Sequence, residues 1–314
     1  MLHKGRIITE QYFNGMNPSS LHHLWSASKS ISVGVVFNLI EEGKLHPDDF
    51  VIRHVPELRT SGYQGATIRH LLDMQSGVKY EYGDLNLALN DSEAGKHFRA
   101  AGVFRKLPNE DVLAGQCSFI GTLRQSRDHG SMFYYKCADT AVLAWACERV
   151  SGVRFADLIS QYIWSKLGAE QDAYIICDIA GETVPNAGIS VTLRDLARWG
   201  QMHLRNGNWR GRKILPKKWL DDTQHNHNHK MIKKDSFLSK DSLVSKTAYR
   251  NQYWIVGESE GAYYAGGAYG QICYIHPKYD IVIARFASEW DDPNINWGRI
   301  IFPAFEEVAK AVAL

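Results

Sequence analysis

The stretch Ser26-Ala27-Ser28-Lys29 stands where a polar segment gives way to a strongly apolar one. Residues 31–40 are rich in Ile, Val and Leu, and Gly43 follows them, which predicts a buried helix over 28–42. A serine and a lysine three positions apart share one helix face. In the first turn, Ser26 would also lie beside unpaired backbone N–H groups at the positive end of the helix dipole. The stretch can therefore supply a hydroxyl nucleophile, an amine that takes its proton and an amide that holds an oxyanion.

A second Ser-x-x-Lys pattern in the same chain, Ser76-Gly77-Val78-Lys79, shows that the pattern alone is weak evidence. It follows a short helix expected over 67–75, and its glycine is typical of a helix end. The dipole has the wrong sign there, and nothing fixes the serine relative to the lysine. The ordinary alternative for Ser26 is a helix cap, so the catalytic interpretation depends on the rest of the chain.

The bulk composition is that of an ordinary globular protein. The chain has 314 residues, of which 45% are hydrophobic and 22% charged, with a net charge of +2. This length is sufficient for a large core, and we expect one domain over 1–314. The small net charge gives no support for binding nucleic acid or an anionic membrane, and no apolar run is long enough for a membrane span.

Location and cofactor use follow from what the sequence does not contain. The N-terminus has no apolar leader segment, and the five cysteines are scattered without a Cys-x-x-Cys pair. Free thiols in the cytoplasm are the simplest interpretation, although a truncated start would weaken it. The alternating histidines of residues 225–229 resemble a zinc site, but no cysteine or carboxylate has ligand spacing near them. We expect a solvated loop there, with no metal and no cofactor.

The order of elements predicts an α+β fold. Strands at both ends of the chain should form an antiparallel sheet, flanked by helices, with an inserted, mainly helical subdomain. The sheet region is expected at about 1–25 and 250–314, the helical region at about 26–222 and a polar surface insertion at about 223–250. Residues 79–133 should be irregular and lid-like. Helices are expected over 138–150, 155–167, 192–204, 216–222 and 296–312, and strands over 5–13, 252–256, 262–265, 271–276 and 280–287.

Two further motifs can contribute to the same chemistry. Tyr135 comes directly before an expected helix, where its phenol can relay a proton if a cation such as Lys29 lies beside it; Tyr135 would in turn keep Lys29 partly neutral. The alternative is a core aromatic residue. The run Ala265-Gly266-Gly267-Ala268-Tyr269-Gly270-Gln271 lies between strands, and its glycines indicate close backbone approach beside an edge that can offer one N–H to an oxyanion. The alternative is a hairpin turn. The pair His22-His23 has no evident partner for a triad.

These three motifs, in this order, resemble those of the serine β-lactamase-like and penicillin-recognising enzymes. The sequence is most similar to the class C branch, which includes DD-peptidases and esterases, and within it to the 6-aminohexanoate-dimer (nylon-oligomer) hydrolases. The similarity extends over nearly the whole chain. It is carried by residues 5–13, 24–30, 71–78, 133–152, 163–173, 192–200 and 267–277.

The resemblance implies roles for particular residues. It implies Ser26 as the acyl-forming nucleophile, Lys29 as the general base and Tyr135 as a second proton-transfer residue. It also implies an oxyanion hole formed by the backbone N–H groups of Ser26 and Ala268. Substrate contacts are expected from Cys137, Tyr82 and Gly267.

Two departures from the family pattern bear on the substrate. Cys137 stands where relatives have Asn or Ser, so the orientation of Lys29 or of a substrate amide has a poorer hydrogen-bonding partner. Ala265 stands where relatives have Lys or His, which argues against strong binding of a substrate carboxylate and against a strong β-lactamase. The family also has a strand before residue 5 for which this chain has no room.

The combined prediction is a serine hydrolase that cleaves small-molecule esters, small amides or peptides through an acyl-enzyme on Ser26. One alternative is a DD-peptidase or weak β-lactamase. The other is a catalytically weak binding or regulatory protein of the same fold. The oligomeric state is left open.

Overall fold

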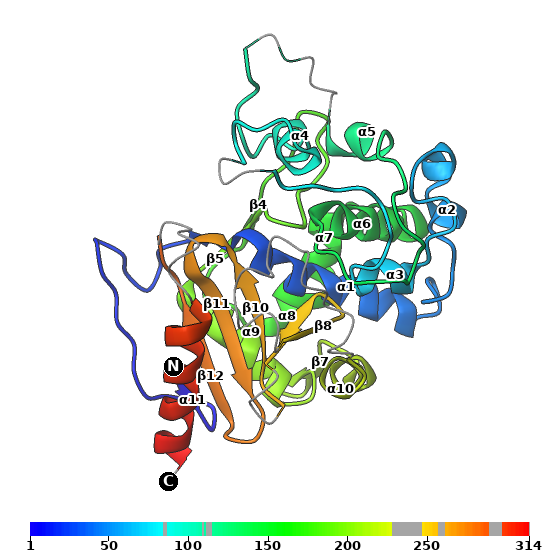
Figure 1. Cartoon of the computed structure of the whole chain (residues 1–314). Coiled ribbons are helices and arrows are strands. Elements are labelled where there is room, and N and C mark those ends of the chain that lie inside the picture. The colour runs from blue at the N-terminus through cyan, green and yellow to red at the C-terminus, as the bar shows by residue number, and fades with distance from the viewer. Residues whose placement is uncertain are drawn as a thin grey trace.

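A seven-stranded antiparallel sheet, in the order β2-β1-β12-β11-β10-β9-β8, forms the centre of the molecule (Figure 1). The computed structural model describes residues 1–83, 87–108, 110, 115–227, 247–256, 261–288 and 297–313. Two strands come from the N-terminus and five from the C-terminal part, which confirms the predicted sheet. The strands are β1 (Leu2–His3), β2 (Arg6–Ile7), β8 (Ala248–Arg250), β9 (Tyr253–Ile255), β10 (Tyr263–Gly267), β11 (Gln271–His276) and β12 (Ile281–Arg285).

Helices cover both faces of this sheet. On one face lies α11 (Trp297–Ala313), drawn in red in Figure 1, where the Phe302 ring packs 4.5 Å from that of Tyr264. On the other face, α9 (Leu193–Leu204) lies against β11 and β12. The contact is close at Gly200, because a Cβ there would come within 2.5 Å of Val282 and 2.9 Å of the Cys273 sulfur. The helix approaches the sheet closely only because this residue has no side chain.

The helical region is built around α1 (Ser28–Glu41) and α6 (Cys137–Ser151), which pack against each other. Nearly every side chain of α1 is buried, so this helix lies inside the protein between the sheet and the helical region. The other elements are α2 (Val51–His54), η2 (Pro56–Thr60), α3 (Ile68–Leu72), α4 (Glu93–Ala100), α5 (Gln116–Ile120), α7 (Phe155–Ile159), the π-helical η3 (Ser160–Trp164), α8 (Ser165–Leu167) and α10 (Lys217–His225). Two small sheets, β3 (His22–His23) with β5 (Ile189–Val191) and β4 (Tyr174–Ile175), and β6 (Asn208–Trp209) with β7 (Arg212–Lys213), complete the chain.

The long periodic segments have the predicted structure. The helices expected over 28–42, 138–150, 192–204 and 296–312 correspond to α1, α6, α9 and α11. The four C-terminal strands correspond to β9 to β12. The segment expected to be a helix over 155–167 is helical throughout, with a π-helical turn in its middle, and ends at Gly168 with φ of +66°.

Other predictions were wrong in position. The strand expected over 5–13 is instead the short hairpin of β1 and β2, which turns at Lys4-Gly5, where both φ values are positive. Residues 22–23 belong to the small β3–β5–β4 sheet and not to the main one. The expected insertion at 223–250 begins within α10 and ends in β8, and residues 228–246 lie outside the described residues. The expected irregular region 79–133 contains α4 and α5.

No helix in the described ranges is both long and apolar enough to cross a bilayer.

Candidate active site

Ser26 lies in a single 3-10 turn, η1 (Trp25–Ala27), that leads directly into α1. The residue that caps α1 is Ala27 and the one that caps η1 is Leu24, and neither cap has a side-chain hydrogen bond. The half-buried Ser26 hydroxyl instead accepts a hydrogen bond from the Lys29 amine, with Nζ and Oγ 3.0 Å apart. The helix-cap alternative for Ser26 is therefore wrong, and the serine and lysine meet across one turn as their spacing predicts.

The Lys29 amine is fully buried and has four neighbours that can accept a hydrogen bond, one of which is the Tyr135 hydroxyl. Besides Ser26, Nζ lies 2.8 Å from the backbone oxygen of Asn186 and 3.3 Å from the sulfur of Cys137. An ammonium has three protons and can donate to three of these acceptors at once, whereas a neutral amine can donate to only two and keeps a lone pair. The described site is therefore shaped for a protonated Lys29, and loss of one proton would free a lone pair.

Tyr135 lies on the other side of this amine. It comes two residues before α6 and is 6% exposed, and the Lys29 Nζ lies 4.9 Å from the centre of its ring. Its ring stacks on Trp254 of β9 at 5.6 Å and meets the edge of the Tyr249 ring at 6.2 Å. The sheet therefore holds the Tyr135 ring against the Lys29 amine. The Tyr135 hydroxyl is hydrogen-bonded to the side chains of Lys29 and Ser26.

The charges of these groups are coupled. Burial raises the pKa of Tyr135, and the nearby Lys29 ammonium offsets this only in part. Burial lowers the pKa of Lys29, but negative charge on Cys137 and Tyr135 outweighs burial and places the pKa above its ordinary value. The sequence analysis expected Tyr135 to keep Lys29 partly neutral, whereas here the pKa of Lys29 lies above its ordinary value. The cause is the Cys137 sulfur, a potential anion at 3.3 Å, together with the phenol.

Cys137 and Tyr82 both lie next to the Lys29 amine. Cys137 is the first residue of α6, and its sulfur lies 3.5 Å from the hydroxyl of Tyr82. The Tyr82 ring lies 6.2 Å from that of Tyr135. These positions place both residues in the site, and their contact with substrate stays a prediction.

The glycine-rich segment brings strand β10 against the Ser26 turn. A Cβ on Gly267 would come within 2.1 Å of the Leu24 carbonyl oxygen and 3.1 Å of the Ala27 nitrogen. Only glycine permits this approach, so Gly267 has a steric role that the sequence pattern indicated. Ala268, the expected second oxyanion residue, follows Gly267 directly and begins the short turn η7 (Ala268–Gly270). The hairpin-turn alternative is also partly right, because this turn connects β10 to β11.

Sequence reasoning missed the segment 185–189, which runs beside the Ser26 turn and holds it by backbone groups. Its carbonyl oxygens accept hydrogen bonds from the side chains of Ser32, Lys29 and His23 and from the backbone N–H of Leu24. Its Ile189 N–H donates to the Ser28 hydroxyl at 3.1 Å. Because nearly all these contacts use main-chain atoms of the segment, no residue pattern could have revealed them.

In the second Ser-x-x-Lys pattern, the serine and the lysine do not contact each other's functional groups but have different partners. The Ser76 hydroxyl donates to the buried carboxylate of Asp139 at 2.7 Å, while the exposed Lys79 pairs with Glu93 at 3.0 Å. Their functional groups thus have separate partners. The His23 ring is hydrogen-bonded to the Ala187 carbonyl oxygen, which is a structural contact.

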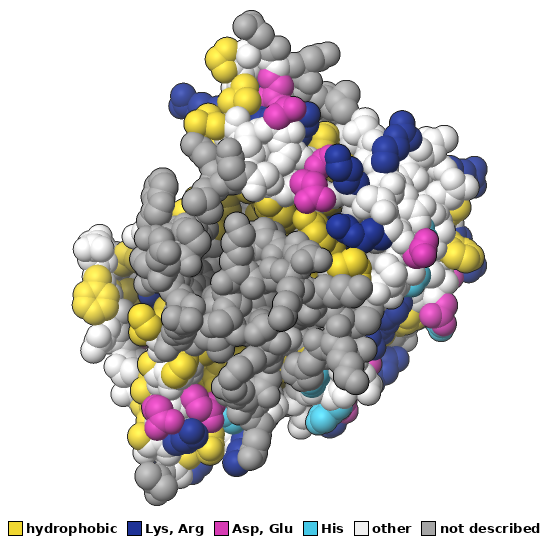
Figure 2. All heavy atoms as spheres, viewed as in Figure 1, with side chains coloured by type: hydrophobic (Ala, Val, Ile, Leu, Met, Phe, Trp, Pro, Cys, Tyr) yellow, Lys and Arg dark blue, Asp and Glu magenta, His cyan; other side chains and the backbone are white. Residues whose placement is uncertain are grey.

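Nothing in the described part of the chain suggests a metal centre. No group of three or more His, Cys, Asp or Glu side chains there is arranged to hold an ion. His225 ends α10, where its ring contacts the Asp221 carbonyl oxygen at 2.9 Å, and His229 lies outside the described residues. On the face in Figure 2, acidic and basic side chains are interspersed among the described residues, as the net charge of +2 suggests.

Comparison with known proteins agrees with this geometry. The sequence model of the β-lactamase family matches residues 1–300. The chain is 35% identical over 313 residues to the 6-aminohexanoate-dimer hydrolase of Paenarthrobacter ureafaciens, covering 99% of this chain and 77% of that protein. A solved structure from Bacillus anthracis, named as a candidate 6-aminohexanoate-dimer hydrolase, has a TM-score of 0.87 and 28% identity over 99% of this chain and 78% of its own.

A candidate β-lactamase from Bacteroides dorei shares the fold at 18% identity, with a TM-score of 0.71 over 98% of this chain and 92% of its own. The family match and the 35% identical relative extend over essentially the whole sequence. This chain therefore belongs to the β-lactamase family and is a serine hydrolase of that family.

Proposed function

We propose that the protein hydrolyses small esters and small amides through an acyl-enzyme formed on Ser26. The observation that carries this proposal is the 3.0 Å contact between the Lys29 Nζ and the Ser26 Oγ, with Tyr135 packed beside the same amine. A serine hydroxyl is a weak nucleophile until a neighbouring base takes its proton. Here the Lys29 amine is buried at the hydroxyl and donates a hydrogen bond to the backbone oxygen of Asn186, and the buried Tyr135 lies beside it.

The proposed reaction has two halves. When the cluster of Lys29 and Tyr135 has lost one proton, the Ser26 Oγ attacks the substrate carbonyl carbon and its proton passes to that cluster, while the N–H groups of Ser26 and Ala268 hold the oxyanion. The tetrahedral intermediate expels the alcohol or amine, which leaves with the proton that the cluster returns. Water then attacks the acyl-enzyme, giving its proton to the same cluster, and the acid leaves as Ser26 regains its proton. No net proton remains on the enzyme.

The substrate class follows from Ala265 and from the named relative. Ala265 is buried in β10 on the same strand face as Gly267, so the first position of this motif supplies no cation for a substrate carboxylate. This favours substrates without an essential carboxylate at that position. The relative of 35% identity is named for hydrolysis of a 6-aminohexanoate dimer, which supports short linear amides as the second class alongside esters.

The test uses the two serines of the chain as a matched pair. Ser26→Ala should abolish both labelling by a fluorophosphonate and hydrolysis of p-nitrophenyl acetate. Ser76→Ala, which removes only the hydrogen bond to Asp139, should keep both. A Ser26→Ala protein that still turns over ester would refute the assignment, and a folded wild type that neither labels nor hydrolyses would favour the binding or regulatory alternative.

A substrate panel then separates the remaining activities. The wild type should hydrolyse p-nitrophenyl esters more efficiently than penicillins or D-Ala-D-Ala peptides, and 6-aminohexanoate dimer, which also ends in a carboxylate, tests whether a short amide is accepted in spite of that charge. Penicillin hydrolysis comparable to the best ester would contradict the interpretation of Ala265.

A further inference from the structure

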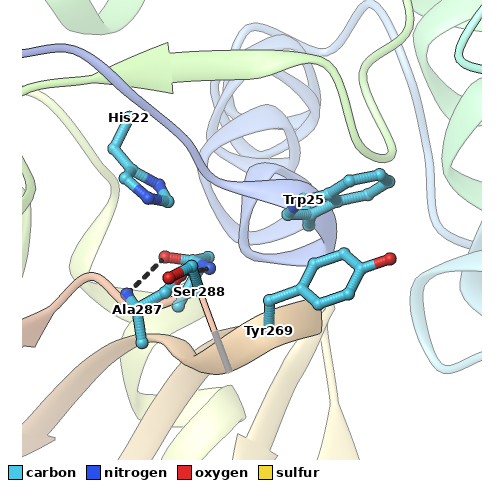
Figure 3. Close-up of a pocket in the computed structure, with 6 residues that line it drawn as sticks. His22, Trp25, Tyr269, Ala287 and Ser288 are labelled. Atoms are coloured by element: carbon cyan, nitrogen blue, oxygen red, sulfur yellow. Dashed lines mark hydrogen bonds between the residues drawn. The ribbon is translucent and has the colours of Figure 1, made fainter. Parts of the chain in front are cut away.

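A pocket of about 350 Å³ adjoins the Ser26 turn, and its walls come from three separate parts of the chain, residues 22–25, 269–271 and 287–288 (Figure 3). Trp25 immediately precedes Ser26, and Tyr269 immediately follows Ala268. The two peptide N–H groups expected to hold the oxyanion therefore belong to residues that neighbour the pocket walls. The lining residues among those described are His22, Trp25, Tyr269, Gln271, Ala287 and Ser288.

Both aromatic walls have unusual backbone conformations. Trp25 has φ of +49° and Tyr269 has φ of +61°, a region in which bulky residues are uncommon. Their rings meet edge to face with centroids 5.2 Å apart, as Figure 3 shows from the side of the pocket. Strained residues persist where the surrounding structure holds them, and they concentrate at ligand sites. The two strained turns thus present adjacent aromatic rings to one cavity beside the turn that contains Ser26.

Hydrogen bonds of Gln271 and ring stacking of His22 hold part of the remaining lining in place. The Gln271 amide donates to the carbonyl oxygens of Ala268 and Ala287, at 3.0 and 2.7 Å, and accepts from the Ala287 N–H at 3.1 Å. The His22 ring stacks on Phe286 at 4.8 Å. None of the six lining residues is Asp, Glu, Lys or Arg. Such a lining fits a planar, uncharged group and gives an ionised one no charge partner.

We propose that this pocket is the substrate-specificity subsite of the enzyme and that it binds an aromatic or similarly planar apolar group of the ester or amide. Trp25 and Tyr269 are its specificity-determining residues. The proposal rests on the proposed Ser26 chemistry, because the pocket is a subsite only if bond cleavage occurs at the neighbouring turn. The ring can belong to the acyl half or to the alcohol half of the substrate, and the two arms of the test distinguish these sources.

The experiment compares substrates that differ by one ring while the reactivity of the ester stays similar. Benzyl acetate against ethyl acetate tests the alcohol half, and ethyl phenylacetate against ethyl acetate tests the acyl half. The readout is the ratio of kcat/KM for the ring substrate to that for ethyl acetate. We expect the wild type to favour the ring in one arm by about tenfold or more, the effect of burying an aromatic side chain of this size.

Three variants locate that preference. Trp25→Ala removes one wall, and Ala287→Leu fills the pocket from the opposite wall without touching the backbone contact to Gln271. Each should lower the favoured ratio by about tenfold. The matched control is Ala169→Leu, a half-buried alanine in the turn after α8 and outside the pocket, which should leave both ratios unchanged. Ala287→Leu keeps the test sharp if Trp25→Ala fails to fold.

The outcomes separate this proposal from the proposed function. Ester hydrolysis that depends on Ser26 but shows no ring preference, or keeps it in Ala287→Leu, would overturn the subsite alone. Hydrolysis that survives Ser26→Ala would overturn the chemistry itself. A preference in one arm, lost in both pocket variants and kept in the control, would support the subsite and identify the half of the substrate that occupies it.

Discussion

Replacing Gly267 by alanine tests whether strand β10 sets the position of the reacting serine. The backbone of Gly267 is ordinary extended chain, with φ of −134° and ψ of 156°, so alanine carries no conformational penalty there. The added Cβ, however, would lie 2.1 Å from the Leu24 carbonyl oxygen. That oxygen accepts the hydrogen bond of the Ala27 N–H at 3.1 Å and so closes the turn that contains Ser26.

The size of the effect follows from this distance. Real Cβ contacts are essentially never shorter than 3.0 Å, so the strand and the turn must separate by about 1 Å. A shift of about 1 Å at a catalytic group costs on the order of 100-fold in rate. Overpacking of this kind costs about 1–3 kcal/mol of stability, which lowers the Tm of a chain of this size by only a few degrees. The variant should therefore fold and yet lose most of its activity.

The assay measures the rate constant of fluorophosphonate labelling, which reports acylation of Ser26 alone, together with kcat/KM for p-nitrophenyl acetate and thermal unfolding. Gly266→Ala is the matched control on the same strand. Its Cβ would meet side-chain atoms alone, those of Tyr264 at 2.8 Å, which can move, and of Trp254 at an ordinary 3.7 Å. We expect Gly266→Ala to label at close to the wild-type rate. Wild-type labelling by Gly267→Ala, at an unchanged Tm, would refute the idea that this contact positions the turn.

Two further predictions concern protons. Because negative charge on Cys137 and Tyr135 holds the pKa of Lys29 above its ordinary value, kcat/KM of the wild type should still be rising at about pH 9. Cys137→Ser should move this rise to lower pH, and Lys29→Arg should be inactive. A wild-type plateau of kcat/KM near neutral pH would contradict the assignment of Lys29 as the base. Burial lowers the pKa of His97 to about 4 and that of His203 to about 3, so the unfolded chain binds protons that the folded chain does not below about pH 6.5. The free energy of unfolding should thus fall with falling pH over this range, by up to about 1.4 kcal/mol per unit for each histidine, and urea titrations of His203→Gln should show a smaller loss than the wild type.

The sequence was sufficient to predict a helix or strand where a long periodic pattern of apolar residues is followed by a residue that ends the element. The segment over 28–42 is such a case, since its buried face is continuous and Gly43 has a positive φ of 72°. The N-terminal strand was misplaced because a β-rich composition does not say which residues pair. Ile7 and Ile8 are 54% and 44% exposed, so their apolar character there does not reflect burial. The hairpin of β1 and β2 depends instead on the turn at Lys4-Gly5.

Much of the site could be predicted because its chemistry resides in side chains at fixed spacing. Ser26 and Lys29 share a helical turn, and the tyrosine before α6 reaches the same amine. The segment 185–189 could not be found in this way, because it acts through carbonyl oxygens that every residue possesses. The charge state of Lys29 could not be found either. It depends on the distance from its amine to the Cys137 sulfur, which only the packing of α1 against α6 determines.

The two departures from the family pattern therefore have different consequences. The position of Ser26 relative to Lys29 is held by one helical turn, by the carbonyl of Asn186 and by the approach of Gly267 to Leu24. The Cys137 sulfur adds a contact to the Lys29 amine at 3.3 Å, and the Ala265 side chain takes no part in this set, so these other contacts remain when either residue is substituted. In the proposed mechanism, Cys137 raises the pKa of Lys29, and Ala265 leaves its position in β10 without a cation for a substrate carboxylate. The chain can thus retain the reaction of its family while its pH dependence and its substrate differ, which is why these properties have to be measured on this protein.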